Sequence, residues 1–246
     1  MKIVFFGASD FTPLVLPYLD KSFEVELVIN EKNMNFKSIE NTKAEIGILA
    51  AFGKIIPKNV LNHFKYGILN IHPSLLPKYR GPSPVQTAIL NGDKETGVTI
   101  IRLDEEIDHG PILGQTSELI KSDDTSLSLY QRLFPLGAEL INKNAEKYIK
   151  NELELTLQDH KVATYTKMLK REDGYFDLDN PPSLEKLDLM IRAYFPWPGA
   201  WTKWNNKILK FLPEKKVQVE GKNLVNYKDF INGYANLDKN LVSLLK

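Results

Sequence analysis

Short apolar runs recur along the N-terminal part of the chain, each separated from the next by turn residues or by a segment with helical spacing. The expected strands cover residues 3–6, 25–29, 46–51, 67–71, 98–103 and 111–116. A helix is expected at 58–64, and another begins at Pro84, capped by Ser83, and ends before Gly92. Strands that alternate with helices predict an α/β fold with a Rossmann-like, mostly parallel sheet flanked by helices.

The character of the sequence changes near residue 155, after a long helical pattern at 125–150. Short mixed segments, a helix expected at 183–192 and a stretch rich in aromatic residues and proline then replace the regular alternation. We therefore expect two domains, at 1–163 and 164–246, the second comprising a linker and a small C-terminal domain. Residues 196–246 hold nine lysines and four acidic residues, which indicates either an anionic partner or a solvated surface.

A polar pair lies at the end of the strand expected at 67–71. Asn70 and His72 are two residues apart, so they share one strand face, and Pro73 should end the strand just beyond them. Open α/β sheets bind ligands at the carboxyl ends of their strands. Asp108, in an acidic segment further along, is a candidate third partner, and an amide, an imidazole and a carboxylate together make a chemical site. The alternative is a buried polar pair that is satisfied by ordinary hydrogen bonds.

Several functional classes are disfavoured by residues that the chain lacks. It has no cysteine, which excludes disulfides, thiol chemistry and cysteine-ligated zinc, and its four histidines are scattered without a metal-binding spacing. Ser9 replaces the second glycine of a dinucleotide-binding turn, and Ser74 lacks the surroundings of a hydrolase nucleophile. No apolar stretch approaches membrane-spanning length and no signal peptide is apparent, so we expect a cytoplasmic protein without a metal ion.

The segments around the polar pair carry a strong resemblance to a known family. Residues 74–81 and 104–113 closely resemble the folate-dependent formyltransferases, and the order and spacing of these motifs make the match specific. Further segments are similar to the members of that family that formylate methionyl-tRNA, and they lie at 6–11, 79–86, 164–167, 173–177, 191–193 and 196–199. The resemblance covers nearly the whole chain.

The resemblance implies transfer of a formyl group from 10-formyltetrahydrofolate to the α-amine of methionyl-initiator tRNA, by a monomer acting in translation initiation. It makes Asn70, His72 and Asp108 the catalytic residues. Phe11 resembles a residue of the methionyl pocket, although a contact within the first helix would use it equally well. Lys78 and Arg80 could bind tRNA phosphates, or they could be surface charges without a functional contact. The apolar residues among those implied for folate binding could equally belong to the hydrophobic core. The residues implied for folate binding are Phe52, Gly53, Ile55, Ile56, Ser74, Leu75, Leu76, Pro77, Leu103 and Asp104.

Two departures from the family pattern concern the acceptor. The family normally inserts a strand, a helix and a basic loop between its second and third strands, but only residues 30–44 stand there. The C-terminal domain, normally a larger OB-type β-barrel, is reduced to about residues 200–246. Both losses fall on tRNA contacts, so an amino-sugar nucleotide stays open as the acceptor. Hydrolysis of the formyl donor and non-catalytic folate sensing are further alternatives. The basic tail at 203–246 is a candidate tRNA-binding segment.

Overall fold

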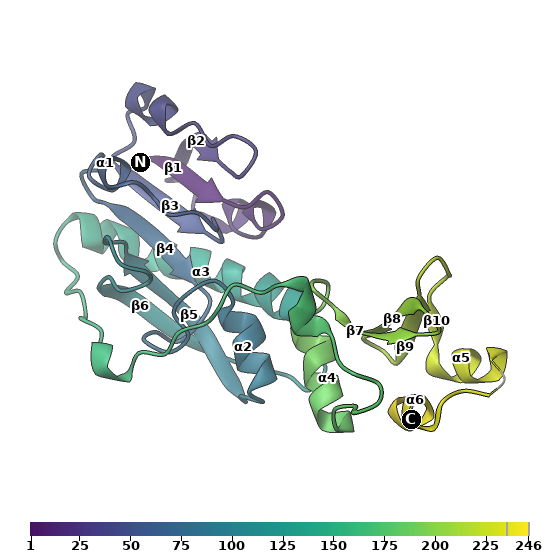
Figure 1. The fold of residues 1–246 in the computed structure, drawn as a ribbon. Helices are drawn as coiled ribbons and strands as arrows, with labels where there is room; N and C mark the ends of the chain where they lie inside the picture. The colour runs from purple at the N-terminus through teal and green to yellow at the C-terminus, as the bar shows by residue number, and fades with distance from the viewer. Residues whose placement is uncertain (235, 246) are drawn as a thin grey trace. The chain divides into compact units, whose positions relative to one another are not determined.

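The computed structural model describes residues 1–234 and 236–245, and it divides into two compact units (Figure 1). The first unit comprises Met1–Pro84, Glu95–Leu119 and Tyr130–Lys167. The second comprises Val85–Lys94, Ile120–Leu129 and Met168–Lys246. Among the described residues, no helix combines the length and the apolar character that crossing a membrane requires.

The first unit is built on a six-stranded sheet with the strand order β2-β1-β3-β4-β5-β6. Its strands are β1 (Lys2–Gly7), β2 (Glu24–Ile29), β3 (Ile46–Ala50), β4 (Ile68–His72), β5 (Glu95–Arg102) and β6 (Ile112–Leu119). Strands β2, β1, β3 and β4 run parallel, whereas β5 pairs antiparallel with both β4 and β6. The expected α/β class is confirmed, and β5 is the strand at which the parallel order reverses.

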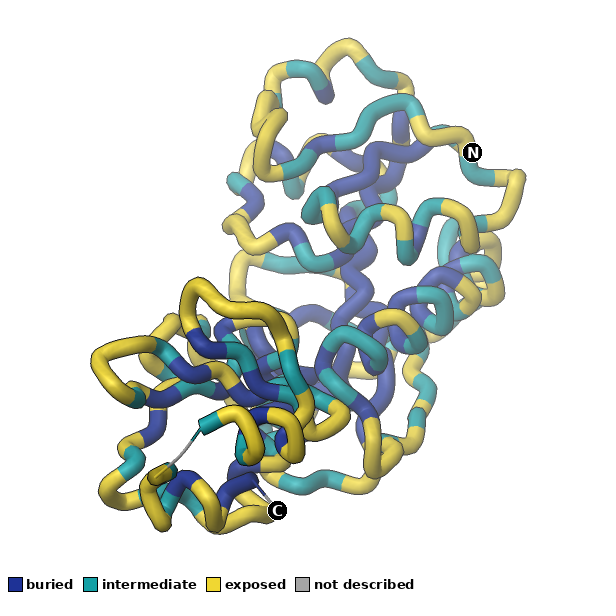
Figure 2. The backbone as a smooth tube through the Cα atoms, turned by 90° about the vertical axis from the view of Figure 1, so that its right-hand side faces the viewer, coloured by how far each residue is buried: buried dark blue, intermediate teal, exposed yellow. Residues whose placement is uncertain are grey.

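One face of this sheet carries an apolar cluster. Phe6 of β1 and Ile68 of β4 belong to it, together with Val60 of α1 (Lys58–Leu61) and Ile39 of η3 (Phe36–Asn41). Figure 2 shows the buried backbone as dark blue segments running through the interior, with exposed loops around it. Short apolar strands in the middle of the sheet form this core, as their sequences predict.

The helix α3 (Ser126–Ile149) packs on the opposite face. A Cβ atom at Gly137 would lie 2.3 Å from Cγ2 of Ile71, so the helix approaches β4 closely at this glycine. Because side chains alternate along a strand, Ile71 faces α3 while Asn70 and His72 face the other side. The fold thus directs the polar pair to the face that carries the apolar cluster.

The helical segments that follow β1 are shorter than a regular α-helix. In place of one first helix, the chain forms two short 3₁₀ turns, η1 (Thr12–Leu14) and η2 (Leu16–Tyr18). Pro13 and Pro17 explain this, since a proline lacks the N–H group that a continuing helix needs. Between β2 and β3 the helical structure is η3 alone, as the short connection predicts.

The second unit holds a smaller antiparallel sheet with the order β10-β9-β8-β7. Its strands are β7 (Ala200–Trp204), β8 (Lys207–Leu212), β9 (Lys216–Val219) and β10 (Val225–Asn226). The helices are α2 (Pro84–Leu90), which falls almost wholly in this unit, α4 (Leu184–Ala193), α5 (Tyr227–Gly233) and α6 (Lys239–Leu244). A small β-rich domain is therefore confirmed at the C-terminal end.

Candidate active site

The strand β4 holds Asn70 and His72 in the interior of the first unit. Every residue of β4 is buried, and the strand pairs with β3 on one side and with β5 on the other. Asn70 is 6% exposed and His72 is 4% exposed. Two polar side chains held this far from water need partners, and both find them within the protein.

Asp108 completes the group from the loop between β5 and β6. Its Oδ1 accepts a hydrogen bond from Asn70 Nδ2 at 3.1 Å, and its Oδ2 accepts one from the backbone N–H of Gly81 at 2.8 Å. The same Oδ2 lies 3.5 Å from His72 Nδ1. The structure therefore brings together the amide, the imidazole and the carboxylate that the sequence singled out.

The other ring nitrogen of His72 is committed to the protein. His72 Nε2 lies 2.9 Å from the carbonyl oxygen of Tyr79. A carbonyl oxygen can only accept, so Nε2 carries a hydrogen and donates it. It follows that Nδ1, on the side of Asp108, is the nitrogen that can gain or release a proton.

Asn70 keeps part of its hydrogen-bonding capacity. Its amide nitrogen carries two hydrogens, and the bond to Asp108 commits one of them. An amide N–H aimed at an acceptor outside the protein is the kind of group that stabilises a developing oxyanion.

The segment after β4 is braced by a buried threonine of β5 and an exposed glutamine of β6. Thr99 Oγ1 donates to the Ser74 carbonyl at 2.6 Å and accepts from the Leu76 N–H at 3.1 Å. Gln115 Nε2 donates to the Leu76 carbonyl and to Thr99 Oγ1. Sequence reasoning assigned Ser74 and Leu76 to folate and missed the two residues that hold them. A threonine inside an apolar strand was the available signal.

A second brace comes from residues 164–167, which pair with the loop at 77–83. The Arg80 N–H donates to the Thr164 carbonyl at 2.8 Å, and the Thr166 N–H donates to the Arg80 carbonyl at 2.7 Å. Gly81 has φ +101°, and a Cβ atom there would lie 2.9 Å from the Thr166 carbonyl oxygen, so glycine is required at this crossing. Residues 164–167 thus belong with the first unit, whose last segment ends at Lys167.

The residues expected to contact the acceptor lie in different settings. Arg80 is 1% exposed, and its guanidinium donates to Gln158, to Tyr165 and to the ring of His160. The structure therefore turns Arg80 inward and does not present it to a phosphate. Lys78 is exposed, with its ammonium 4.5 Å from the centre of the Tyr79 ring.

Phe11 is half-buried, and its ring packs against two aromatic rings of α3. The ring centres lie 5.0 Å from Tyr130 and 5.4 Å from Phe134. It also precedes η1 as the N-cap residue. Both of its expected roles, in a pocket wall and at the start of the first helix, are compatible with this place.

The expected folate-binding residues fall into a buried group and an exposed group. Phe52, Ile56 and Leu103 pack in or against the apolar cluster, whereas Ile55 is 85% exposed. Ser74 and Leu76 are buried, Leu75 and Pro77 are half-buried, and Gly53 is exposed.

One ion pair joins the segment after β3 to the loop after β5, and a further contact lies within that second loop. Lys58 Nζ and Glu105 Oε1 form an exposed ion pair at 2.6 Å. Asp104 accepts a hydrogen bond from His109 Nδ1 at 2.7 Å, and the His109 ring stacks on that of His160 at 3.9 Å. The Asp104–His109 contact lies within the loop that carries Asp108.

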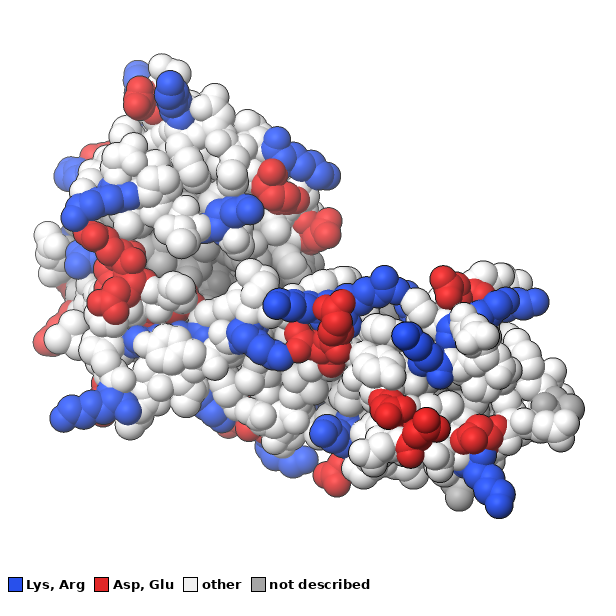
Figure 3. Space-filling view, in the orientation of Figure 1, with Lys and Arg blue, Asp and Glu red and all other residues white. Residues whose placement is uncertain are grey.

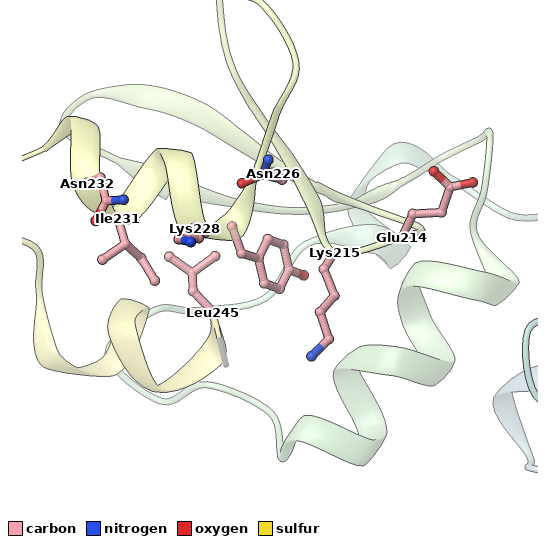
Figure 4. Close-up of a pocket in the computed structure, with 8 residues that line it drawn as sticks. Glu214, Lys215, Asn226, Lys228, Ile231, Asn232 and Leu245 are labelled. Carbon is pink, nitrogen blue, oxygen red and sulfur yellow. The ribbon is translucent and has the colours of Figure 1, made fainter.

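The second unit contains a pocket of about 440 Å³ beside α5 (Figure 4). It is lined by Glu214, Lys215, Asn226, Tyr227, Lys228, Ile231, Asn232 and Leu245. No residue predicted for catalysis or for folate lines it. Basic and acidic side chains are interspersed on the face drawn in Figure 3, including the part formed by the C-terminal unit.

Comparisons with known proteins show which family the chain resembles. The family model described as formyl transferase matches residues 9–144, and that of the formyl transferase C-terminal domain matches residues 168–215. A curated relative named methionyl-tRNA formyltransferase, from Roseiflexus sp. (strain RS-1), is 43% identical over 175 residues, which cover 71% of this chain and 53% of the relative. The chain spans 53% to 60% of the length of the first five such relatives.

Two solved structures share the fold. The methionyl-tRNA formyltransferase from Clostridium thermocellum superposes with a TM-score of 0.71 at 22% identity, over 92% of this chain and 96% of that one. HypX from Aquifex aeolicus, solved in complex with tetrahydrofolic acid, superposes with a TM-score of 0.74 at 21% identity, over 86% of this chain and 37% of that one.

Proposed function

The chain belongs to the formyl transferase family, and we propose that it transfers a formyl group from 10-formyltetrahydrofolate to the α-amine of methionyl-initiator tRNA, for translation initiation. The observation that carries this proposal is the convergence of Asn70, His72 and Asp108 on one face of the sheet. Formyl transfer needs a donor for the developing oxyanion, a carrier for one proton and a group that orients the carrier. The three side chains match these needs.

Asn70 is the proposed oxyanion donor. The formyl donor supplies an activated carbonyl carbon, and negative charge develops on the formyl oxygen when the amine attacks that carbon. The second N–H of Asn70 can donate to this oxygen, while the first stays on Asp108. Loss of one such donor typically costs about 2.7 to 4 kcal/mol of transition-state stabilisation.

His72 is the proposed proton carrier. As the new N–C bond forms, Nδ1 takes the proton that the amine loses, and it returns the proton to the donor nitrogen as the old C–N bond breaks. Nε2 keeps its own hydrogen on the Tyr79 carbonyl throughout. The ring is cationic between the two steps, and Oδ2 of Asp108, 3.5 Å from Nδ1, stabilises that cation.

Folate binding is proposed for the two loops beside this group. Ile55 and Ile107 are 85% and 62% exposed, and they offer apolar surface that a flat ring system would cover. The backbone of residues 52–56 and 103–108 supplies N–H and C=O groups for the polar edge of a pterin. HypX, a structural neighbour, was solved with tetrahydrofolic acid, which is consistent with a folate donor.

The acceptor is proposed from the curated relatives, which are named for methionyl-tRNA. Phe11 and exposed Lys78 remain the proposed acceptor contacts in the first unit. An amino-sugar nucleotide is the second candidate, and one observation favours it. The β2–β3 connection holds only η3 as helical structure, which leaves less protein than usual to contact a tRNA.

An acceptor panel tests the proposal. The purified chain is mixed with 10-formyltetrahydrofolate and with either methionyl-initiator tRNA or amino-sugar nucleotides, and the products are weighed by mass spectrometry. We expect a gain of one formyl group on the methionyl amine and none on the sugars. Formyl sugars without formyl-methionyl-tRNA would establish the second candidate, and formate released without any acceptor would indicate a hydrolase.

A further inference from the structure

A buried glutamine holds the backbone of the Asp108 loop. Gln158 lies in the segment after α3 and is 6% exposed. Its Nε2 donates to the carbonyl oxygen of Asp108 at 2.9 Å and to that of Gly110 at 2.8 Å. Two hydrogens of one amide therefore fix two carbonyl groups, one on each side of His109.

Asp108 needs such support because of its backbone conformation. Its φ is +49°, in the left-handed region, where a residue with a side chain usually loses about 1 to 2 kcal/mol relative to the right-handed region. The two carboxylate oxygens accept from Asn70 of β4 and from the Gly81 N–H of the loop that follows β4. A loop held in an unfavourable conformation stays there only when its surroundings fix it.

Arg80 determines which way the Gln158 amide points. Gln158 Oε1 accepts from Arg80 Nη2 at 2.7 Å and from Nε at 3.2 Å. A guanidinium can only donate, so the oxygen must face Arg80 and the nitrogen must face the two carbonyls. Arg80 is itself anchored through His160 Nδ1 at 2.8 Å, and it precedes Gly81, whose N–H bonds to Asp108 Oδ2.

We propose that Gln158, oriented by Arg80, is a positioning residue that sets the place of the Asp108 carboxylate beside His72. The inference rests on the proposed function and deepens it. Gln158 acts through Asp108 and does not touch a substrate. A displacement of about 1 Å at a reacting group can cost a hundredfold in rate, so this amide is expected to matter for turnover.

The variant Gln158→Glu separates positioning from folding. The new carboxylate has nearly the same shape and still accepts from Arg80, so the buried guanidinium keeps its partner. It places an oxygen where Nε2 was, opposite the carbonyls of Asp108 and Gly110, and it repels both. Gln131→Glu, on an exposed position of α3, is the matched control.

Amide hydrogen exchange reports on the geometry independently of activity. We expect the Gly81 N–H, which bonds to Asp108 Oδ2, to exchange at least about tenfold faster in Gln158→Glu. The Gly47 N–H, bonded to the Gly67 carbonyl between β3 and β4, should keep its rate. In the formyl-transfer assay, kcat should fall about 10- to 100-fold, with KM for the formyl donor within about twofold. Gln131→Glu should match the wild type in all respects.

Three results would overturn the inference. Unchanged Gly81 exchange would show that Gln158 does not hold the loop, and equal acceleration at Gly81 and Gly47 would show a general loss of stability. Selective acceleration at Gly81 with unchanged kcat would show that the position of Asp108 is irrelevant to turnover. If Gln158→Glu fails to fold, Arg80→Lys tests the same contact, because a lysine cannot reach every acceptor that the guanidinium fork serves. If the wild type forms no formyl-methionyl-tRNA, the proposed function fails, while the exchange rates still decide whether Gln158 positions Asp108.

Discussion

At the scale of single residues, the chemistry depends on which nitrogen of His72 is free to exchange a proton. The Tyr79 carbonyl occupies Nε2, and Asp108 lies beside Nδ1. The sequence predicted that an imidazole would meet a carboxylate, but it could not give the tautomer. The backbone carbonyl that sets the tautomer belongs to Tyr79, whose φ of +63° no sequence pattern announces.

Two substitutions of His72 separate its two nitrogens. In His72→Gln the side-chain amide reaches the place of Nε2, and in His72→Asn it reaches the place of Nδ1. Neither amide can carry a proton, so both variants should lose about 10²- to 10⁴-fold in kcat. Only the glutamine can still donate to Tyr79 O, so chemical denaturation should show His72→Asn less stable by about 1 to 3 kcal/mol. Equal stability of the two variants would contradict the assigned tautomer.

At the scale of elements, the sequence predicted the strands and the polar pair more completely than it predicted the loops. Apolar runs predicted β1, β3 and β4 because these strands are buried almost along their whole length, which leaves a plain pattern in the sequence. The direction of β5 depends on long-range pairing, so its antiparallel course was not predicted. The roles of Gln158 and Thr164 were missed for the same reason, since their partners lie 48 residues or more away in the chain.

The contact between α3 and β4 is tested by a pair of glycine substitutions. Gly137→Ala places a Cβ atom about 2.3 Å from Ile71 Cγ2, and the helix must shift away from the strand that carries Asn70 and His72. Overpacking of this kind typically costs about 1 to 3 kcal/mol, and the formyl-transfer rate should fall as well. Gly233→Ala, in α5 with nothing within 4 Å of the new atom, should be neutral or slightly stabilising. Equal melting temperatures for the two variants would refute this packing.

The second unit carries a titratable core residue at the start of α5. Burial, with a smaller contribution from the nearby Asp188 carboxylate, raises the pKa of Tyr227 to about 12. Folding therefore favours the neutral phenol. This stabilisation is present in full below pH 10 and is lost as the pH rises through 12, by at most about 3 kcal/mol.

Absorbance at 295 nm, followed against pH, should show a late tyrosine ionisation in the wild type that Tyr227→Phe lacks. The melting temperature of the wild type should also fall more steeply above pH 10 than that of Tyr227→Phe. Parallel pH curves for the two proteins would mean that Tyr227 titrates normally.

At the scale of the whole molecule, the two units carry different functional features. The first carries the proposed catalytic group, and the second carries the lysine excess that the sequence placed at the C-terminal end. The lysine excess is read directly from the sequence, but the sequence does not show whether the lysines form a continuous basic surface. On the face in Figure 3 they are interspersed with acidic residues.

If the basic tail at 203–246 binds tRNA, the affinity for tRNA should depend on the salt concentration. Raising monovalent salt from about 50 to 200 mM should weaken tRNA binding tenfold or more if two or more phosphates are neutralised. Replacing Lys203, Lys207 and Lys210 of the second unit with glutamine should flatten that dependence, measured by filter binding. Replacing exposed Lys21 and Lys150 of the first unit should leave it unchanged. If the affinity of the wild type for tRNA does not change with salt, the basic tail does not bind tRNA phosphates.

The central claim is that Asn70, His72 and Asp108 carry out formyl transfer, and a single-turnover rate measures it most directly. Radiolabelled formyl donor, methionyl-initiator tRNA and excess enzyme would be mixed, and the label on the tRNA would be followed for the wild type, Asn70→Ala and the surface control Gln131→Ala. We predict rapid transfer by the wild type and the control, and a rate about 10²- to 10³-fold lower for Asn70→Ala, the cost of one oxyanion donor. Transfer by Asn70→Ala at the wild-type rate would contradict the account.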